Sequence, residues 1–432
     1  MKACLTIILS FCLLPWWAKA QQYQRAARIA QQDSVSTIPL PEMHHNYFGW
    51  KVAIDGNRAA VIAMSTELGD KKDPAACYLF EKGTNGWGMK QRLQLSLDSF
   101  PGFQLTGTMA LSGDYLILGL GLLDDKHCAV IFHFDQETGL WQQQQVLFAP
   151  SDEAQSFFAW AVDISDEYAM VSAANERLGK IADAGSIYVY KRNNALWEQV
   201  QQLRPADPQA SGFFGSKLAL SKNCLLVGMP AGNSDAKSKF PLLNAGCAYI
   251  FRKDRRSGQW MQSAKLVARD RSEKDLFGTS VALQGNCAVV GAPAEDEDPD
   301  GAHTLEGSGS VYVFTKQRRG RHWKQRQKLT AKDRAYSGGF GYDLAIDGNT
   351  LLAGSYWRDS MAGCAYTFQK SNGKWTEGQK LVAEQRKARD MFGLSVDISG
   401  SNLIIGAYQK STQPFSYDHP GERGEVYIFE KR

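Results

Sequence analysis

The stretch FGTSVALQGNCAVVGAP, residues 277–293, is one copy of a pattern that repeats along most of this 432-residue chain. Its first seven residues alternate like a strand with one buried face, and QGN at residues 284–286 predicts a tight turn. The nearly apolar residues 287–291 predict a second strand, SVYVF at residues 310–314 a third, and Trp323–Leu329 a fourth. The stretch therefore predicts four consecutive antiparallel strands.

The pattern occurs seven times, and successive copies begin 55, 55, 56, 63, 63 and 52 residues apart. The Phe residues that open the copies are Phe48, Phe103, Phe158, Phe214, Phe277, Phe340 and Phe392. A repeat of about 50 residues with four short strands is typical of a propeller blade. The fold class that we predict is all-β: a seven-bladed β-propeller of four-stranded antiparallel blades.

The ring needs a strand from the N-terminal part of the chain. Six copies have a fourth strand, marked by a Trp six residues before a Leu, but the seventh copy ends with its third strand at residues 426–429. An N-terminal strand that completes blade 7 would close the ring and remove an exposed sheet edge. The best candidate is Val35–Ile38, with the sequence VSTI.

The first residues have the pattern of a secretory signal. Lys2 precedes an apolar run at residues 3–14, and AKA at residues 18–20 fits a cleavage site. We therefore expect a secreted or periplasmic protein with three parts: a signal peptide (1–20), an N-terminal segment with the closing strand (21–47), and the propeller (48–432). No later run approaches the roughly 20 apolar residues of a membrane helix, so we expect no membrane span, and we expect a monomer.

Charge does not favour nucleic acid as a partner. The formal net charge of +4 falls to +2 without residues 1–20, which contain two Lys and no acid. Basic hairpins are predicted at residues 252–256 and 316–324, but these tips nearly lack the aromatic side chains that stack on bases. We interpret them as solvated hairpin tips rather than a polymer-binding patch.

The mature chain has six cysteines, and their places in the repeat favour free thiols over disulfides. Cys128, Cys247 and Cys364 occupy the same position in copies that are not adjacent. Equivalent positions of such blades lie too far apart for the roughly 7 Å limit on Cα atoms of a disulfide. Secretion leaves a disulfide possible as the alternative.

The repeated residues resemble a known family. FG at residues 277–278, GAP at 291–293 and GSVYVF at 309–314 are similar to the motifs of FG-GAP repeats. Over residues 48–432 the chain resembles secreted bacterial FG-GAP propeller proteins and, more distantly, the amino-terminal propeller of integrin α subunits. That resemblance implies protein recognition. Integrin-like repeats often carry a calcium loop between their first two strands, but turns as short as DGN at residues 55–57 do not support calcium there.

Long loops between the second and third strands are the predicted functional sites. The strand-two and strand-three glycines are 18 residues apart in copies 4, 5 and 7, but 9 apart in copy 6 (Gly354 to Gly363). Long loops on a rigid scaffold commonly carry binding residues.

Two of these loops supply the candidate residues. The acidic loop of copy 5 offers Glu295, Asp296, Glu297, Asp298 and Asp300. Calcium could bind Asp296, Asp298 and Asp300, but without EF-hand spacing we favour a solvated acidic loop and expect no cofactor. The loop of copy 7 offers Phe415, Tyr417 and Asp418, a mixture typical of protein-binding loops, although aromatic side chains also anchor long loops.

The sequence has no linear catalytic signature: no G-x-S-x-G, H-E-x-x-H, P-loop or C-x-x-C. We therefore predict a non-catalytic binding module for a protein or a surface polymer such as a glycan, acting through the long loops of copies 4, 5 and 7. The alternative is a propeller hydrolase or lyase acting on glycans, with carboxylates near the axis as acid and base. Acidic side chains from different blades that converge in the central funnel would favour this alternative.

Overall fold

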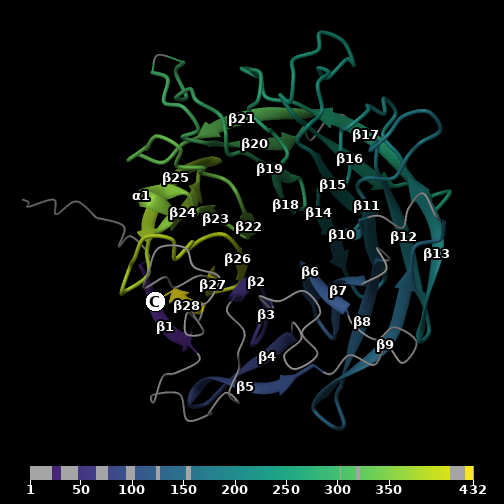
Figure 1. The fold of residues 1–432 in the computed structure, drawn as a ribbon, viewed down its shortest axis with the longest axis vertical. Coiled ribbons are helices and arrows are strands. Elements are labelled where there is room, and N and C mark those ends of the chain that lie inside the picture. Colours follow the sequence, from purple (N-terminus) through teal and green to yellow (C-terminus); the bar gives the residue numbers. More distant parts are fainter. Residues whose placement is uncertain are drawn as a thin grey trace, which may run out of the picture.

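Seven antiparallel sheets of four strands each form a closed ring (Figure 1). The structure is a computed structural model, and it describes residues 22–30, 47–64, 76–93, 103–122, 127–151, 157–301, 303–317, 322–408 and 424–431. The predicted all-β, seven-bladed propeller is therefore confirmed. No helix in these ranges is long and apolar enough to cross a membrane.

Blades 1 to 4 each contain four strands that are consecutive in sequence. Blade 1 contains β2 (Tyr47–Asp55), β3 (Arg58–Met64), β4 (Ala76–Gly83) and β5 (Gly86–Arg92). Blade 2 contains β6 (Phe103–Ser112), β7 (Tyr115–Leu122), β8 (His127–Asp135) and β9 (Leu140–Phe148). Blade 3 contains β10 (Phe158–Ile164), β11 (Tyr168–Ala173), β12 (Ser186–Asn193) and β13 (Leu196–Leu203). Blade 4 contains β14 (Lys217–Ser221), β15 (Cys224–Met229), β16 (Cys247–Lys253) and β17 (Trp260–Leu266).

Blades 5 and 6 follow the same order, and blade 7 combines both ends of the chain. Blade 5 contains β18 (Ser280–Gln284), β19 (Cys287–Ala292), β20 (Ser310–Lys316) and β21 (Trp323–Leu329). Blade 6 contains β22 (Leu344–Asp347), β23 (Thr350–Ser355), β24 (Cys364–Ser371) and β25 (Lys374–Leu381), with the short α1 (Arg358–Met361) before β24. Blade 7 contains β26 (Val396–Ser399), β27 (Asn402–Ala407), β28 (Glu425–Lys431) and the outermost β1 (Tyr23–Ala30).

The ring is closed by an N-terminal strand, as predicted, but by a different segment. β1 (Tyr23–Ala30) pairs antiparallel with β28, whereas Val35–Ile38 lies outside the described residues. Tyr23 and Ile29 are six residues apart and buried, and they take the places of the Trp and Leu of the other fourth strands. Tyr23 lies opposite Lys431 as Trp323 lies opposite Lys316. The spacing was visible in the sequence, but Tyr in place of Trp concealed it.

The repeated glycines lie where the backbones of neighbouring blades touch. A Cβ on Gly291 of blade 5 would overlap the carbonyl oxygen of Gly341 in blade 6, and one on Gly354 would overlap that of Gly393 in blade 7. Gly341 also has a φ of +86°, which residues other than Gly rarely adopt. The same overlap occurs at the 4–5 and 7–1 interfaces, between Gly228 and Gly278 and between Gly406 and Gly49.

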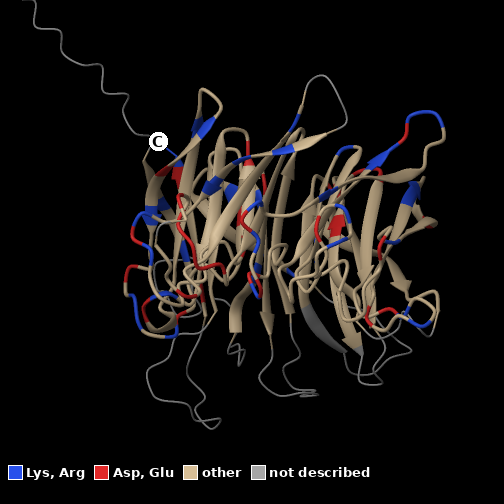
Figure 2. Cartoon of the chain, turned by 90° about the horizontal axis from the view of Figure 1, so that it is seen from above, with Lys and Arg blue, Asp and Glu red and all other residues tan. Residues whose placement is uncertain are grey.

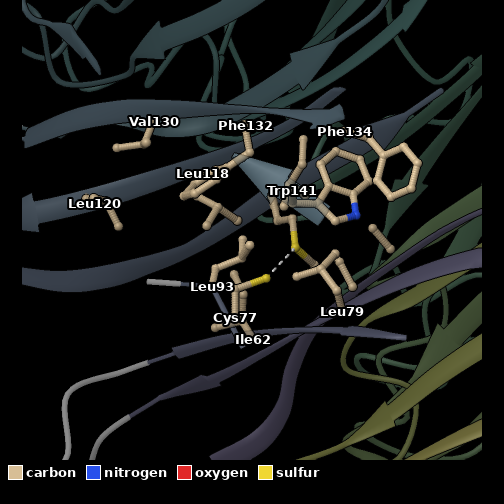
Figure 3. Close-up of a cluster of buried hydrophobic side chains, with 14 of the residues drawn as sticks. Ile62, Cys77, Leu79, Leu93, Leu118, Leu120, Val130, Phe132, Phe134 and Trp141 are labelled. Atoms are coloured by element: carbon tan, nitrogen blue, oxygen red, sulfur yellow. Dashed lines mark hydrogen bonds between the residues drawn. The ribbon is translucent and has the colours of Figure 1, made fainter. Parts of the chain in front are cut away.

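Apolar side chains fill the space between blades. Between blades 1 and 2, Ile62, Leu79 and Leu93 face Leu118, Phe132 and Trp141 (Figure 3). The six cysteines among the described residues are buried and unpaired, as expected, and the Cys77 Sγ lies 3.8 Å from the Met109 Sδ. Lys, Arg, Asp and Glu lie mainly at the connections and outer edges (Figure 2).

A glutamine amide ties the outer strands of neighbouring blades. The Gln lies four residues after the Trp of one blade, and its amide makes two hydrogen bonds to the backbone of the Trp of the next blade. Gln327 Nε2 donates to the Trp375 carbonyl at 2.7 Å, and Trp375 N donates to Gln327 Oε1 at 3.0 Å. Gln379 makes the same pair with Tyr23 of the closing strand, at 3.1 and 2.9 Å. Gln91, Gln145 and Gln201 repeat it with Trp141, Trp197 and Trp260.

Removal of the amide that holds the closing strand should destabilise the ring. We expect Gln379→Ala to lower the free energy of unfolding by about 1–3 kcal/mol, because the Tyr23 N–H and carbonyl lose their partner. Lys374→Ala, at the exposed tip of the same hairpin, is the control and should change stability by less than about 0.5 kcal/mol. Thermal unfolding followed by circular dichroism would measure both variants, and equal melting temperatures would contradict the role of this amide.

Candidate functional site: the axial channel and its mouth

The first strands of all seven blades line a channel along the ring axis. They are β2, β6, β10, β14, β18, β22 and β26, which surround the centre of the ring (Figure 1). The cavity that they enclose has a volume of about 240 Å³. Strand register assigns the side chains that face it to successive layers, each with one residue per blade.

One layer of the channel is alanine in five blades and aspartate in two. The alanines are Ala53, Ala110, Ala219, Ala282 and Ala345, and the equivalent residues of blades 3 and 7 are Asp163 and Asp397. Asp163 accepts hydrogen bonds from Leu220 N of blade 4 at 2.6 Å and from Ile164 N at 2.8 Å. Asp397 likewise accepts from Ile54 N of blade 1 and from Ile398 N, both at 2.8 Å.

These two aspartates have unusual ionisation behaviour. Burial raises the pKa of Asp163 to about 7, although its backbone N–H partners oppose the shift. Burial also raises the pKa of Asp397 to about 6. Proximity of the two carboxylates contributes to the shift at Asp163, because like charges disfavour ionisation. Both groups therefore titrate near neutral pH.

The adjacent layer holds a three-residue ion cluster. Asp343 of blade 6 lies 3.1 Å from Lys51 Nζ of blade 1 and 3.8 Å from Lys217 Nζ of blade 4, and it accepts from Val396 N at 3.0 Å. Burial alone would raise the pKa of Asp343, but the two ammonium groups hold it below its ordinary value. Burial lowers the pKa of Lys217. Three carboxylates and two ammonium groups from five blades thus converge on the axis.

Aromatic side chains of blades 6, 7 and 1 lie next to this ion cluster. Trp50 and Tyr342 directly precede Lys51 and Asp343 in the sequence. The Trp50 ring centroid lies 4.8 Å from that of Tyr408, and the Tyr342 centroid lies 4.4 Å from that of Tyr356. We call the aromatic arc the six residues on blades 6, 7 and 1: Tyr47, Trp50, Tyr342, Tyr356, Trp357 and Tyr408.

The two halves of the arc adjoin each other, and a second group lies on blade 3. Burial raises the pKa of Tyr408 to about 12, and Tyr47 of one half and Tyr342 of the other both contribute. On blade 3, Phe157 and Trp160 are 38% and 47% exposed, with ring centroids 5.0 Å apart. Blades 6, 7, 1 and 3 thus each carry aromatic side chains in or next to their first two strands.

The repeat does not single out these residues, because they lie at positions that vary between its copies. The mouth residues Trp50, Trp160 and Tyr342 follow Phe-Gly or Phe-Ala, at the third position of the motif, which differs from copy to copy. Alignment of the seven first strands would have shown aspartate at two positions where the other copies have alanine.

The predicted acidic residue Glu295 is a structural group of blade 5. It is 1% exposed and accepts from Ser310 Oγ at 2.5 Å and from Lys328 Nζ at 2.8 Å. Lys328 Nζ also lies 2.7 Å from Asp270. Among the described residues, Asp270, Glu295 and Glu297 are the group of carboxylates that approach within 4.8 Å of one another. The Lys328 ammonium already bridges two of them.

The other described residues of the predicted acidic loop hold backbone groups or are exposed. Asp296 Oδ1 accepts from Gly307 N at 2.7 Å, Asp298 Oδ1 accepts from Asp300 N at 3.2 Å, and Asp300 is exposed. Phe415, Tyr417 and Asp418 lie outside the described residues. Calcium at Asp296, Asp298 and Asp300 stays the less favoured alternative to a solvated acidic loop.

The family of the chain is decided by its repeats. The model of the FG-GAP repeat matches residues 141–190, 197–251, 260–314, 323–368 and 375–429, together more than half of the chain. The chain belongs to the FG-GAP repeat family. FG-GAP repeats are typical of extracellular proteins. The Phe-Gly and Gly-Ala-Pro motifs of this FG-GAP propeller contain the glycines that touch across the blade interfaces.

Comparison with solved structures supports the propeller architecture alone. The chain is similar to a structure described as U3-55K, with 12% sequence identity and a TM-score of 0.53, over 95% of this chain and 100% of that one. At this identity the likeness shows a shared fold. No curated protein has a sequence that matches the chain.

The channel aspartates should make the stability of this FG-GAP propeller depend on pH. Burial raises the pKa of the Asp163 carboxyl from 3.8 to about 7, so the folded state binds this proton more tightly than the unfolded state does. The stability that the bound proton contributes is therefore fully present below pH 3.8 and is lost as the pH rises to about 7. Asp163→Ala with Asp397→Ala, the residue of the other five blades, should flatten this loss between pH 4 and 7. Melting temperatures across that range would test it, and parallel curves for the two proteins would contradict it.

Chelation tests the acidic loop of blade 5. We expect the melting temperature to be the same in calcium and in chelator, because Lys328 neutralises Glu295 and backbone N–H groups occupy Asp296 and Asp298. Differential scanning calorimetry of the parent and of Asp296→Ala with Asp298→Ala is the measurement. A drop in the parent that the double variant lacks would instead establish a calcium site.

Proposed function

We propose that this protein is a secreted, non-catalytic binding module for a protein or a surface polymer, and that the aromatic arc at the channel mouth is the centre of its binding surface. The observation that carries the proposal is the gathering of six Tyr and Trp side chains beside the ion cluster of Lys51, Lys217 and Asp343. Tyr and Trp supply large contact area with a polar group, and they are enriched where proteins bind partners.

The exposure of the arc supports a role in binding. Within the arc, Trp357 is 39% exposed and Tyr47, Trp50, Tyr342 and Tyr408 are half-buried, whereas Tyr356 is buried like the repeated Phe and Tyr residues of the blade interfaces. Packing alone would bury such a side chain, as it buries Trp260 and Trp375 at 2% exposure. A partner that covers the mouth would remove this apolar area from water.

The long loop of blade 4 supports the same face. In a propeller, the connections between strands two and three share a face with the crossovers between blades. Phe240 and Leu243 of this loop are 75% and 52% exposed. The loops of blades 4 and 5 would then form part of the rim of the surface, with apolar contacts from blade 4 rather than acidic ones from blade 5.

Cleavage of a glycan by a hydrolase or lyase reaction is the second candidate function. It is favoured by the convergence of Asp163, Asp343 and Asp397 in the channel, which is the arrangement that separates the two functions. Carboxyl groups with pKa values near 7 and 6 suit proton transfer near neutral pH. Binding is preferred because each of the three carboxylates already accepts a backbone N–H from another blade, which leaves less of it free for proton transfer to a substrate.

The test is binding of the mature chain, residues 21–432, to envelope and culture fractions of the producing organism. We expect Trp50→Ala with Trp357→Ala to weaken retention at least tenfold, because both indoles leave the mouth. Leu196→Ala removes a side chain that is 59% exposed on the hairpin between β12 and β13, at the opposite face, and should bind like the parent.

Two outcomes of this test would overturn the proposal. Unchanged retention by the double Trp variant, with its melting temperature preserved, would contradict the role of the arc. Release of soluble sugar from the fraction, abolished by Asp163→Ala and Asp397→Ala, would replace the binding proposal with the enzyme.

A further inference from the structure

Blade 3 contains a second cavity, of about 470 Å³, which lies away from the axis. Its walls come from the crossover between blades 2 and 3 (Pro150 and Ser151), from Glu176 after β11, and from Gln199 and Gln202 of β13. A volume of this size suits a small-molecule ligand. The seven-fold repeat explains why the cavity is there.

In blades 4, 5 and 6 an ion pair anchors the equivalent crossover. The residue before the Leu of the fourth strand is Lys, and it pairs with an Asp four residues after the Leu of the preceding blade. The pairs are Lys265 with Asp207 at 2.6 Å, Lys328 with Asp270 at 2.7 Å and Lys380 with Asp333 at 2.7 Å.

A second anchor in the same three blades is a hydrogen bond from the crossover backbone. The acceptor is the side chain two residues after the Trp of the fourth strand. The donor is the backbone N–H three residues after the Leu of the preceding blade. The acceptors and donors are Gln262 with Ala206 N at 2.9 Å, Gln325 with Arg269 N at 3.0 Å and Glu377 with Lys332 N at 2.7 Å.

Blade 3 has lost both anchors through three residues. Ser151 stands at the place of the Asp, and Gln202 stands at the place of the Lys. Pro150 stands at the place of the N–H donor, and proline has no N–H. Gln199 therefore cannot accept the equivalent bond, and its side chain makes no hydrogen bond to the residues that the structure describes. The cavity occupies the space that these anchors fill in other blades.

The floor of the cavity is a completed polar network. Glu176 is 3% exposed and has the place that Glu295 has in blade 5. Its carboxylate accepts from Ser186 Oγ, from Tyr188 Oη at 3.0 Å and from Gln202 Nε2 at 2.8 Å. The neutral amide of Gln202 thus takes the place of the Lys328 ammonium, and little of the carboxylate remains for a cationic ligand.

The groups left for a ligand are cationic and neutral. Arg204 lies on the cavity with its side chain 53% exposed. Its Nη2 lies 3.9 Å from Glu176 Oε1 and donates to Gln202 Oε1 at 2.9 Å, and the guanidinium has further N–H groups. The exposed Arg177 also lines the cavity, together with the Gln199 amide and the Ser151 hydroxyl. Two guanidinium groups against one buried carboxylate give the cavity a formal charge of +1.

We propose that this cavity of blade 3 binds a sugar acid, a compact ring that bears a carboxylate and several hydroxyl groups. The guanidinium groups of Arg204 and Arg177 match a carboxylate in a bidentate geometry. Gln199 and Ser151 supply donors and acceptors for ring hydroxyls. An amino acid fits less well, because the Gln202 amide already occupies the place where its ammonium would meet Glu176.

Calorimetric titration of the mature chain with glucuronate, galacturonate and N-acetylneuraminate tests the proposal, with glucose as the uncharged control. We expect at least one acid to bind with a Kd below about 1 mM and glucose not to bind. Arg204→Gln should weaken binding at least tenfold. Arg252→Gln removes an exposed arginine of blade 4 outside this cavity and should bind like the parent.

A variant that follows the other blades tests the location. Ser151→Asp with Gln202→Lys should fill the cavity with the ion pair of blades 4, 5 and 6 and abolish binding. Binding of none of the three acids, or binding that Arg204→Gln leaves unchanged, would overturn the proposal. If the double variant fails to fold, the Arg204→Gln result decides alone, and inorganic phosphate binding without sugar-acid binding would also contradict it.

Discussion

The contact between glycine backbones of neighbouring blades is the constraint on which the ring depends. At the 5–6 interface the Cα of Gly291 approaches the Gly341 carbonyl so closely that a Cβ would overlap it, and three further interfaces repeat the contact. Side chains larger than hydrogen would push the blades apart and misalign the apolar layers between them. The interfaces from blade 1 to blade 4 instead carry the glutamine pairs with the Trp backbone. Each of the seven interfaces thus has at least one of the two ties.

The fold could be predicted from the sequence because it follows from repeated residues. Period-two alternation, tight turns and the Trp-to-Leu spacing each occur many times, so an exception in one copy does not hide the architecture. The closing strand was misplaced for the same reason, since it occurs once and has Tyr23 and Ile29 where the repeat has Trp and Leu. A short run of residues with high β-propensity, such as Val35–Ile38, is a weaker signal for a fourth strand than the six-residue spacing between Tyr23 and Ile29.

The candidate site could not be predicted in the same way, because it consists of departures from the repeat. Acidic composition drew attention to the loop of blade 5, yet Glu295 is paired with Lys328 and Asp296 holds a backbone N–H. A charge in the sequence does not reveal whether the fold neutralises it. Trp50, Tyr342, Asp163 and Asp397 come from four different blades, and only closure of the ring brings them around one axis. Comparison of equivalent positions, as for Pro150 and Gln202 in blade 3, identifies such departures better than composition does.

The two channel aspartates show why departures from the repeat point to function. Alanine at the same layer in five blades demonstrates that packing of the channel does not require a carboxylate. With pKa values of about 7 and 6, Asp163 and Asp397 are ionised near neutral pH only at a cost to stability. Their bonds to Leu220 N and Ile54 N recover part of this cost, but blades with alanine hold together without them. Residues that lower stability without improving packing are expected where a protein binds or reacts, and here they line the axial channel.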